Sequence, residues 1–479
     1  MFCWKCVSKV GKKPDNVNRI EKVRNIAYGN QKILGILRGR TFHAKAQSET
    51  QVFRKRRTSI TLIHESIITQ TRVTNTMAES MICIEDFEKY ALKHLTPSVR
   101  DYYNSGAGEM FSLKLNVEAF KKYRIRPRFL RNVSKRDLTT TILGERISMP
   151  LGVAPAAMQR MAHPEGECAN ARAAQEAGTI YILSTISTSS IEEVAEAAPD
   201  AIKWFQLYIY KDRNVTLNLV SRAERAGFKA LLLTVDAPLF GDRRLDIKNK
   251  FSLPSHLRLR NFEGELSSKI NNAESGSGLN EYVTNLFDAS LTWNDIKWLK
   301  SITKLPLILK GILTPQDALL AIEYGASAIV VSNHGARQID TIPASIEALS
   351  EITKAVDGRI EVYMDGGVRQ GIDVFKALAL GAKMVFVGRP MLWGLTCDGK
   401  NGARAVLEVF RKEIDVAFAL SGCATVNDVT RDMVQHESYY SRTHSQISPD
   451  ETKLQNVKGN YTTKKVHNVR FPVALCGRQ

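Results

Sequence analysis

Apolar and polar positions alternate in a regular pattern between about residues 150 and 390. Short apolar runs rich in β-branched residues, typical of buried strands, occur eight times, at 151–154, 180–184, 204–208, 230–235, 305–310, 328–333, 361–365 and 384–389. Apolar residues at helical spacing separate several of these runs, at 164–177, 215–226, 315–324, 343–355 and 371–380. Glycine follows four of these helical segments, as expected just past a helix end, at Gly178, Gly227, Gly325 and Gly381.

Eight strands that alternate with helices predict the α/β class and a (β/α)8 TIM barrel. An open sheet of eight strands is the alternative. The count of eight favours the barrel, as do the phosphate-binding signals after the last two strands. We also expect a short N-terminal helical segment before the first strand, beginning near Met77.

The connection after the fourth predicted strand is unusually long. It runs from residue 235 to the next clear helix near Trp293, whereas most connections in such folds have about 2–6 residues. It contains Pro254 and the sequence SGSGL at 275–279. Loops on this face build the active sites of barrel enzymes, so we expect a long loop that forms a lid over the barrel mouth. An ordinary surface insertion is the alternative.

The strong positive charge of the chain lies at its two ends. The formal net charge is +18, and residues 1–76 hold 16 Lys and Arg against four Asp and Glu, while residues 443–479 hold six against two. Residues 77–442 are therefore nearly neutral, so no nucleic-acid partner is predicted for the body of the protein. We predict a basic extension over 1–76 that is disordered or resembles a transit peptide, a barrel domain over 77–442, and a disordered basic tail over 443–479.

Composition narrows the class further. The chain has 479 residues, of which 44% are hydrophobic and 24% charged, as in ordinary globular proteins. It contains no run of about 18 apolar residues, so we predict no membrane span. Its seven cysteines lie far apart, which fits a reducing compartment. Cys3 and Cys6 have the spacing of half a zinc site but lack a second ligand pair, so no metal site is predicted.

Two glycine- and arginine-containing segments predict a phosphate site. Gly366 and Gly367 follow the seventh strand and let backbone N–H groups approach an anion, and Arg369 adds charge-assisted hydrogen bonds. Gly388 and Arg389 follow the eighth strand. The loops after strands seven and eight form the usual phosphate cradle of a TIM barrel, so we expect a bound phosphate group there.

The loop after the sixth strand carries a candidate base. His334 suits proton abstraction near neutral pH, and Arg337 suits bidentate binding of a carboxylate. Asp236, after the fourth strand, could orient His334 and raise its basicity. Lys310, in the fifth strand, could hold positive charge against an electron-rich cofactor. Because parallel strands end at one mouth of the barrel, we expect these side chains to form one site.

The segment 332–340, with the sequence SNHGARQID, resembles the FMN-dependent α-hydroxy acid oxidase family. Further motifs with the same resemblance are DYYNSGA at 101–107, APAAM at 154–158, FQLY at 205–208, LKG at 309–311 and DGGVR at 365–369. Their order and spacing agree with the family over about 77–440, which leaves out the two basic ends. The resemblance implies bound FMN and oxidation of (S)-2-hydroxy acids to 2-oxo acids.

The resemblance also implies a role for each site residue. His334 is the base, Asp236 is its partner, and Tyr208 binds the substrate hydroxyl or the product carbonyl. Lys310 lies beside the N1–O2 edge of the flavin. The residues implied to bind the substrate are Tyr102, Tyr208, Arg243 and Arg337. The residues implied to hold FMN are Pro155, Ala156, Ala157, Ser184, Gln206, Thr234, Lys310, Ser332, Asp365, Gly366, Gly367, Val368, Arg369, Gly388 and Arg389.

The oxidant implied by the resemblance is dioxygen, with release of hydrogen peroxide. A lactate-type flavin dehydrogenase with another electron acceptor is the alternative. The resemblance further implies a homotetramer in the peroxisome, with the mitochondrion or the cytosol as alternative compartments. The chain ends in Gly477, Arg478 and Gln479 rather than in a tripeptide of the Ser-Lys-Leu type.

One departure from the family concerns the substrate. Glycolate-preferring members carry Trp where this chain has Ile186. An aliphatic residue there should widen the pocket and remove an indole N–H donor. We therefore expect longer or branched 2-hydroxy acids, including lactate, to be preferred over glycolate.

Overall fold

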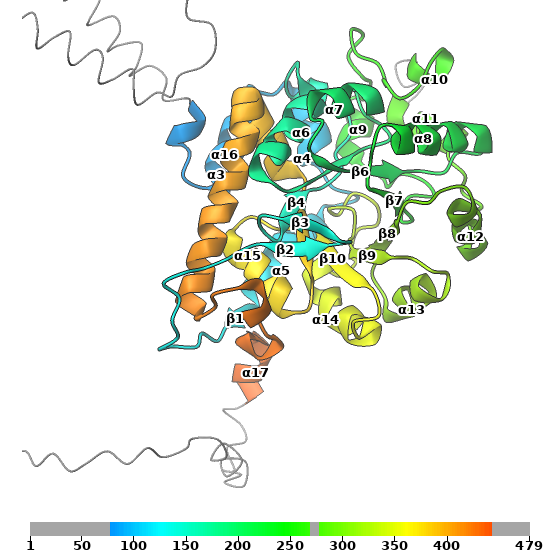
Figure 1. The fold of residues 1–479 in the computed structure, drawn as a ribbon. Coiled ribbons are helices and arrows are strands. Elements are labelled where there is room, and N and C mark those ends of the chain that lie inside the picture. Colours follow the sequence, from blue (N-terminus) through cyan, green and yellow to red (C-terminus); the bar gives the residue numbers. More distant parts are fainter. Residues whose placement is uncertain (1–76, 269–276, 443–479) are drawn as a thin grey trace, which may run out of the picture. The chain divides into compact units, whose positions relative to one another are not determined.

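Eight parallel strands close into a barrel in the computed structural model, which describes residues 77–268 and 277–442 (Figure 1). The TIM barrel prediction is therefore confirmed. The predictions for the basic ends, 1–76 and 443–479, lie outside the described residues. The barrel strands are β4 (Leu151–Val153), β5 (Ile180–Leu183), β6 (Ile202–Leu207), β7 (Ala230–Thr234), β8 (Leu307–Ile312), β9 (Ala328–Val331), β10 (Glu361–Asp365) and β11 (Met384–Val387). The ring closes where β11 pairs with β4.

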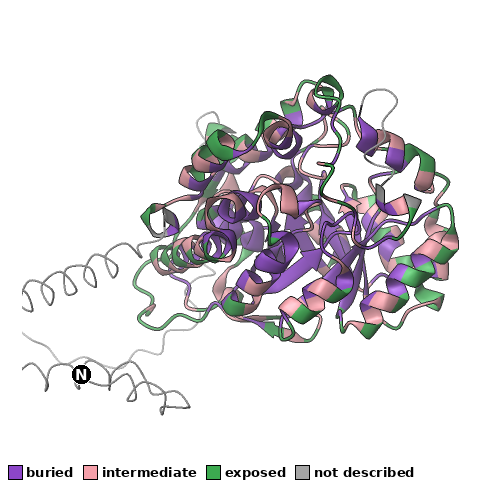
Figure 2. Cartoon of the chain, turned by 90° about the horizontal axis from the view of Figure 1, so that it is seen from above, coloured by how far each residue is buried: buried purple, intermediate pink, exposed green. Residues whose placement is uncertain are grey.

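Helices surround the barrel and turn their apolar faces toward it, as the buried inner and exposed outer faces in Figure 2 show. These helices are α6 (Gly166–Ala177), α7 (Ile191–Ala197), α8 (Arg213–Arg225), α12 (Trp293–Ser301), α13 (Pro315–Glu323), α14 (Ser345–Val356), α15 (Gly371–Ala379) and α16 (Arg389–Ser421). The apolar pattern missed α7, which is short. The sequence nevertheless carries its signal, because Ser190 and Glu193 form a capping box at its start.

Large side chains fill the lower part of the barrel. Trp204, Tyr363 and Phe386 come from three strands and lie with ring centroids 5.5–5.9 Å apart. Gly152 makes room for them, because a Cβ there would lie 2.5 Å from Met384 Cε and 2.9 Å from Phe386. The interior below the site is therefore packed, and the opening lies at the carboxyl ends of the strands.

The remaining elements lie before, within and after the barrel. The predicted N-terminal helical segment is present as a 3-10 turn over Met77–Ser80 and the helices α3 (Ile84–His94), α4 (Pro97–Asn104) and α5 (Phe111–Lys121). Small pairings involve β1 (Tyr123–Ile125) with β12 (Val434–His436), and β2 (Thr140–Ile142) with β3 (Glu145–Ile147). Short 3-10 turns cover Gln159–Met161, Val426–Asp428 and Arg431–Met433, and α17 (Glu437–Arg442) ends the described part.

The long connection after the fourth strand is confirmed, but it is not irregular throughout. It contains three short helices, α9 (Arg244–Lys248), α10 (Glu265–Ser268) and α11 (Gly278–Leu286). Buried residues such as Phe251, Leu259 and Tyr282 anchor this segment. The first two residues of the SGSGL sequence at 275–279 lie outside the described residues.

The long helix α16 is broken at Asp398 and Gly399, where the backbone leaves the helical conformation. It packs along α3 and α6 (Figure 1). Across the described ranges 77–268 and 277–442, no helix is long and apolar enough to cross a membrane.

Candidate active site

A cavity opens at the carboxyl ends of the barrel strands. All but two of the site residues predicted from the sequence line this cavity. The two that do not line it stand directly behind its wall. Asp236 contacts the imidazole of His334, and Ser332 bridges Lys310 and Asp365. The expectation of one site at one mouth therefore agrees with the geometry.

The candidate base is held by an unusual stretch of backbone after β9. His334, Gly335 and Ala336 all have positive φ values, of 58°, 61° and 62°. Such a run is strained for the two residues that carry a side chain and needs support from its surroundings. Asn333 gives that support, because its Oδ1 accepts from the backbone N–H of Ala336 and its amide pairs with that of Asn116.

The imidazole of His334 is paired with a carboxylate. Its Nδ1 lies 2.9 Å from Asp236 Oδ1. Burial lowers the pKa of His334 below its ordinary value, against the opposing effect of Asp236, and the charge of Lys310 lowers it further. Burial alone would raise the pKa of Asp236, but the charges of His334 and Lys310 outweigh it and the pKa is lowered. A neutral imidazole that donates Nδ1–H to an ionised carboxylate leaves Nε2 free to take a proton.

Two arginines supply positive charge on one side of the cavity. Arg337 donates from Nη1 to the backbone carbonyls of Tyr102 and Ser105. Arg243 donates from Nε to the carbonyl of Arg337 and from Nη2 to Gln338 Oε1. Since a guanidinium has five N–H donors, both arginines keep donors for a carboxylate. Burial, aided by the neighbouring Arg337, lowers the pKa of Arg243 to about 10, so it stays charged at neutral pH.

Two tyrosines face the same space with their hydroxyls protonated. Burial raises the pKa values of both Tyr102 and Tyr208. Tyr208 stacks on Phe287 with the ring centroids 4.6 Å apart, and Tyr102 stacks on Phe251 at 4.3 Å. The guanidinium carbon of Arg337 lies 4.8 Å from the Tyr102 ring centroid. Both phenols can therefore donate hydrogen bonds from fixed positions.

A row of polar side chains crosses the floor of the cavity. Gln206 donates to Thr234 Oγ1 at 3.1 Å and accepts from Ser184 Oγ at 3.2 Å. Farther along, Lys310 Nζ lies 3.0 Å from Ser332 Oγ and 3.4 Å from Asp365 Oδ2. Hydrogen-bonding groups of both kinds in fixed positions suit the polar edge of a flavin ring.

The predicted phosphate cradle has the required backbone. Gly366 and Gly367 have φ values of 99° and 82°, and a Cβ on Gly367 would lie only 2.0 Å from the carbonyl oxygen of Asn116. Helix α16 begins beside them with Gly388 as its N-cap, which offers no side chain to the first N–H groups. A helix start beside glycine-rich backbone suits a phosphate, so these residues fit FMN.

Arg389 has a second role that its sequence position did not reveal. Its guanidinium donates to the backbone carbonyls of Tyr103, Ser105 and Gly335, at 2.9, 2.9 and 3.1 Å. It therefore ties the loop after α4 to the His334 loop. Burial lowers the pKa of Arg389.

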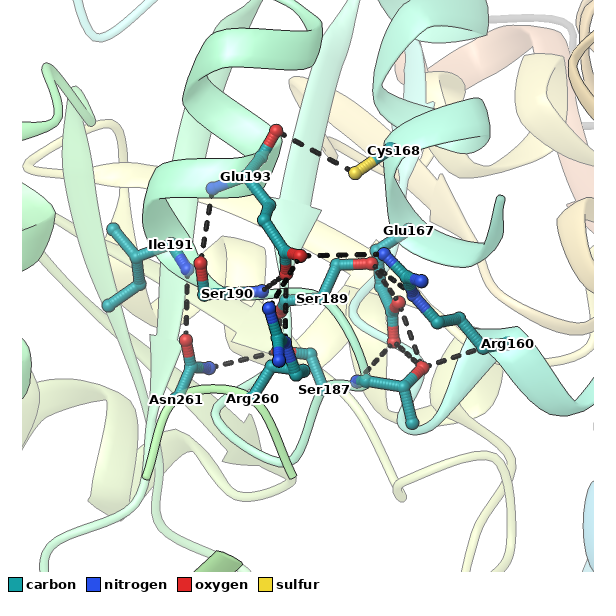
Figure 3. A network of polar contacts seen from close by, with 11 residues as sticks. Arg160, Glu167, Cys168, Ser187, Ser189, Ser190, Ile191, Glu193, Arg260 and Asn261 are labelled. Carbon is teal, nitrogen blue, oxygen red and sulfur yellow. Dashed lines mark hydrogen bonds and ion pairs between the residues drawn. The ribbon is translucent and has the colours of Figure 1, made fainter. Parts of the chain in front are cut away.

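A buried carboxylate, Glu167, belongs to a network of polar contacts that includes Ser187 and Ser189 (Figure 3). Glu167, on α6, is fully buried. It accepts hydrogen bonds from the backbone N–H groups of Gln159 and Thr188, at 2.9 and 2.8 Å, and from the hydroxyls of Thr188 and Ser189. Glu167 thus joins the segment after β4 to the segment after β5, and both line the cavity.

Some residues that line the cavity were not predicted from the sequence. Tyr103, Phe240 and Leu392 line the cavity. Tyr103 could have been found, because it lies in the same motif as Tyr102. Phe240 and the buried Asp246 lie in the long connection, where no periodic pattern marks them.

Comparisons with known proteins agree with this geometry. The family described as FMN-dependent dehydrogenase matches residues 91–436. Glycolate oxidase 3 of Arabidopsis thaliana is 55% identical over 348 residues, covering 73% of this chain and 94% of its own. Human 2-hydroxyacid oxidase 1 is 52% identical over 361 residues, covering 75% and 98%. A crystal structure of mandelate oxidase with (S)-4-hydroxymandelic acid is 40% identical, with a TM-score of 0.71 and coverage of 74% and 98%.

The resemblance drawn from the motifs is thereby confirmed, and so is FMN as the cofactor. The matched region includes the strands of the barrel and all the residues that line the cavity. The chain belongs to the FMN-dependent dehydrogenase family, and its relatives include glycolate and 2-hydroxyacid oxidases.

Proposed function

We propose that this protein oxidises (S)-2-hydroxy acids to 2-oxo acids and reduces dioxygen to hydrogen peroxide. The observation that carries the proposal is the His334–Asp236 pair, 2.9 Å apart, in one cavity with Arg243 and Arg337. Those groups match a molecule with a carboxylate next to a hydroxyl-bearing carbon whose oxidation releases a proton to a base. The closely similar oxidases support dioxygen as the acceptor.

Each residue has a role that follows from its surroundings. Arg243 and Arg337 bind the substrate carboxylate with their remaining N–H groups, and the Tyr102 hydroxyl adds a further donor. Tyr208 donates to the oxygen on the carbon that is oxidised. His334 takes the proton at Nε2, and Asp236 stabilises the imidazolium that forms.

The residues proposed to hold FMN form three groups. The backbone at Pro155, Ala156 and Ala157 and the side chains of Ser184, Gln206, Thr234 and Lys310 face the ring, and Ser332 supports Lys310 from behind the cavity wall. Asp365 to Arg369 and Gly388 to Arg389 hold the phosphate. When bound, FMN accepts two electrons from the hydroxy acid and passes them to dioxygen.

Ile186 supports a preference for substrates larger than glycolate. Its side chain lines the cavity, and the residue is only 1% exposed. Phe240 and Tyr208 line the same cavity, so an apolar substituent on the substrate can be buried there. We therefore expect lactate and longer 2-hydroxy acids to have higher kcat/KM than glycolate.

The test uses the purified full-length chain. Its visible spectrum is recorded without oxygen, before and after addition of glycolate, lactate or a longer 2-hydroxy acid. Bleaching of a yellow protein is the expected result, and peroxide should form when air is admitted. Bleaching without peroxide, but with turnover of an artificial dye, would favour the dehydrogenase alternative. A yellow protein that no hydroxy acid bleaches would overturn the proposal.

Assembly and location are proposed by family relationship alone. We propose a homotetramer, which light scattering of the purified protein tests. We also propose the peroxisome as the compartment, since catalase there would remove the peroxide. Imaging of the full-length chain with both ends native distinguishes this compartment from the mitochondrion and the cytosol.

A further inference from the structure

Asp246 is a buried carboxylate that none of the roles above uses. It lies in the first turn of α9, three residues after Arg243, and is only 1% exposed. Both of its oxygens are buried, and neither accepts a hydrogen bond from any residue in the described part of the chain. Burial of a carboxylate in this way is costly, so this side chain does not stabilise the fold through hydrogen bonds.

The charges that act on Asp246 are those of the substrate site. Burial raises the pKa of Asp246 above its ordinary value, and the neighbouring Asp101 adds to this effect, while the charges of Arg337 and Arg243 oppose it and favour the ionised form. Neither arginine donates a hydrogen bond to Asp246. Their engaged N–H groups bind backbone carbonyls and the side chain of Gln338 instead. Asp246 therefore acts on the pair through space and leaves the other N–H groups free.

Packing keeps this arrangement in place. Helix α9 packs against α4, which carries Tyr102. The Tyr102 ring stacks on Phe251, whose backbone N–H donates to the Asp246 carbonyl at 2.8 Å. Asn249, just beyond α9, donates to Asp101 Oδ2 at 2.9 Å. The backbone of Asp246 is thus held by the same phenylalanine that stacks on the substrate-binding tyrosine.

We propose that Asp246 is a counter-anion of the Arg243–Arg337 pair and makes the site selective for monoanionic over dianionic acids. The proposal rests on the proposed function, in which the pair binds a carboxylate. Two arginines and one aspartate leave a single net positive charge, which one carboxylate neutralises. A second carboxylate on the ligand is repelled by Asp246 instead of being attracted by an uncompensated cation.

The test compares two ligands of nearly equal shape and different charge. Oxalate carries two negative charges and oxamate carries one. Their dissociation constants are measured on the holoenzyme from the change that each causes in the flavin absorption spectrum. In Asp246→Asn both ligands should bind more tightly, and the preference for oxalate over oxamate should rise on the order of tenfold. Asp246→Glu should keep the ratio of the native protein.

A matched control removes a carboxylate that faces solvent. The Glu109 side chain is 83% exposed, and its contact with Arg244 spans 3.8 Å. Glu109→Gln changes the net charge equally and should leave the ratio unchanged, because exposed charges are screened. If Asp246→Asn does not yield holoenzyme, Asp246→Ser is used in its place.

The outcomes separate the two proposals. If the ratio of the oxalate and oxamate dissociation constants in Asp246→Asn or Asp246→Ser stays within twofold of the native value, the proposed role of Asp246 is overturned. Failure of both neutral variants to fold would also overturn it, because the carboxylate would then be structural. A native holoenzyme that binds neither ligand would instead contradict the carboxylate site in the proposed function.

Discussion

Replacement of Glu167 should lower the stability of the protein and its affinity for FMN without changing any residue that reacts with the substrate. Glu167 is fully buried and accepts from the backbone N–H groups of Gln159 and Thr188 and from two hydroxyls. Glu167→Gln keeps one acceptor oxygen for the two N–H groups. Its amide nitrogen then faces the hydroxyls of Thr188 and Ser189, which can turn to accept. Glu167→Ala removes every acceptor.

The expected magnitudes follow from these contacts. In Glu167→Ala the N–H groups of Gln159 and Thr188 stay buried without an acceptor, at about 1–3 kcal/mol each. The space left by the side chain adds about 1 kcal/mol. The free energy of unfolding should therefore fall by about 3–7 kcal/mol, a large share of the roughly 5–15 kcal/mol typical of a folded protein. Glu167→Gln loses only the charge assistance and should cost about 1–2 kcal/mol.

Two measurements check this expectation, namely urea unfolding of the holoenzyme and the dissociation constant of FMN. FMN should bind more weakly in both variants, and most weakly in Glu167→Ala, because both segments tied by Glu167 line the cavity. Glu193→Ala is the control, since Glu193 belongs to the same network but its side chain is 31% exposed and pairs with Arg260. That variant should cost about 1 kcal/mol and leave FMN binding unchanged. Native stability and native FMN affinity in Glu167→Ala would refute the reasoning.

Four further predictions concern the chemistry of the site. His334→Gln should keep bound FMN and lower kcat by about 100-fold or more, as measured by anaerobic flavin reduction. Because burial lowers the pKa of His334 below its ordinary value of 6.5, kcat/KM should fall only at a more acidic pH than an ordinary histidine would give. Asp236→Asn removes a group that raises this pKa, so the acidic limb of kcat/KM should move to still lower pH while kcat falls. Ile186→Trp should shift the ratio of kcat/KM values toward glycolate, and an unchanged ratio would show that this wall does not select the substrate.

The barrel could be predicted because each of its strands repeats the same physical signal. A strand buried on both faces needs a continuous apolar run, and the run from Ala328 to Val331 illustrates this. Once the strands are counted, the topology places every residue that follows a strand at one mouth. His334, Asp236 and Lys310 are far apart in the sequence, yet their convergence follows from the fold alone.

The segment after β7 could not be predicted in the same way. Helices α9 and α10 have only five and four residues, too few for a periodic pattern and too few to be stable alone. They depend on distant contacts, such as the stacking of Tyr102 on Phe251. Phe240 and Asp246 belong to this segment, so their place at the site depends on contacts that no local pattern records.

Three buried carboxylates differ in function because they differ in their hydrogen-bond partners. Glu167 is saturated with hydrogen bonds, so it fixes two segments in place and its removal should act on stability and on FMN affinity. Asp236 shares one bond with His334, so it acts on the protonation of the base. The Asp246 carboxylate has no hydrogen-bonding partner among the described residues, so its field acts on the arginine pair instead. The three residues have the same functional group in one protein, and the number of donors around each predicts which measurement will respond when it is replaced.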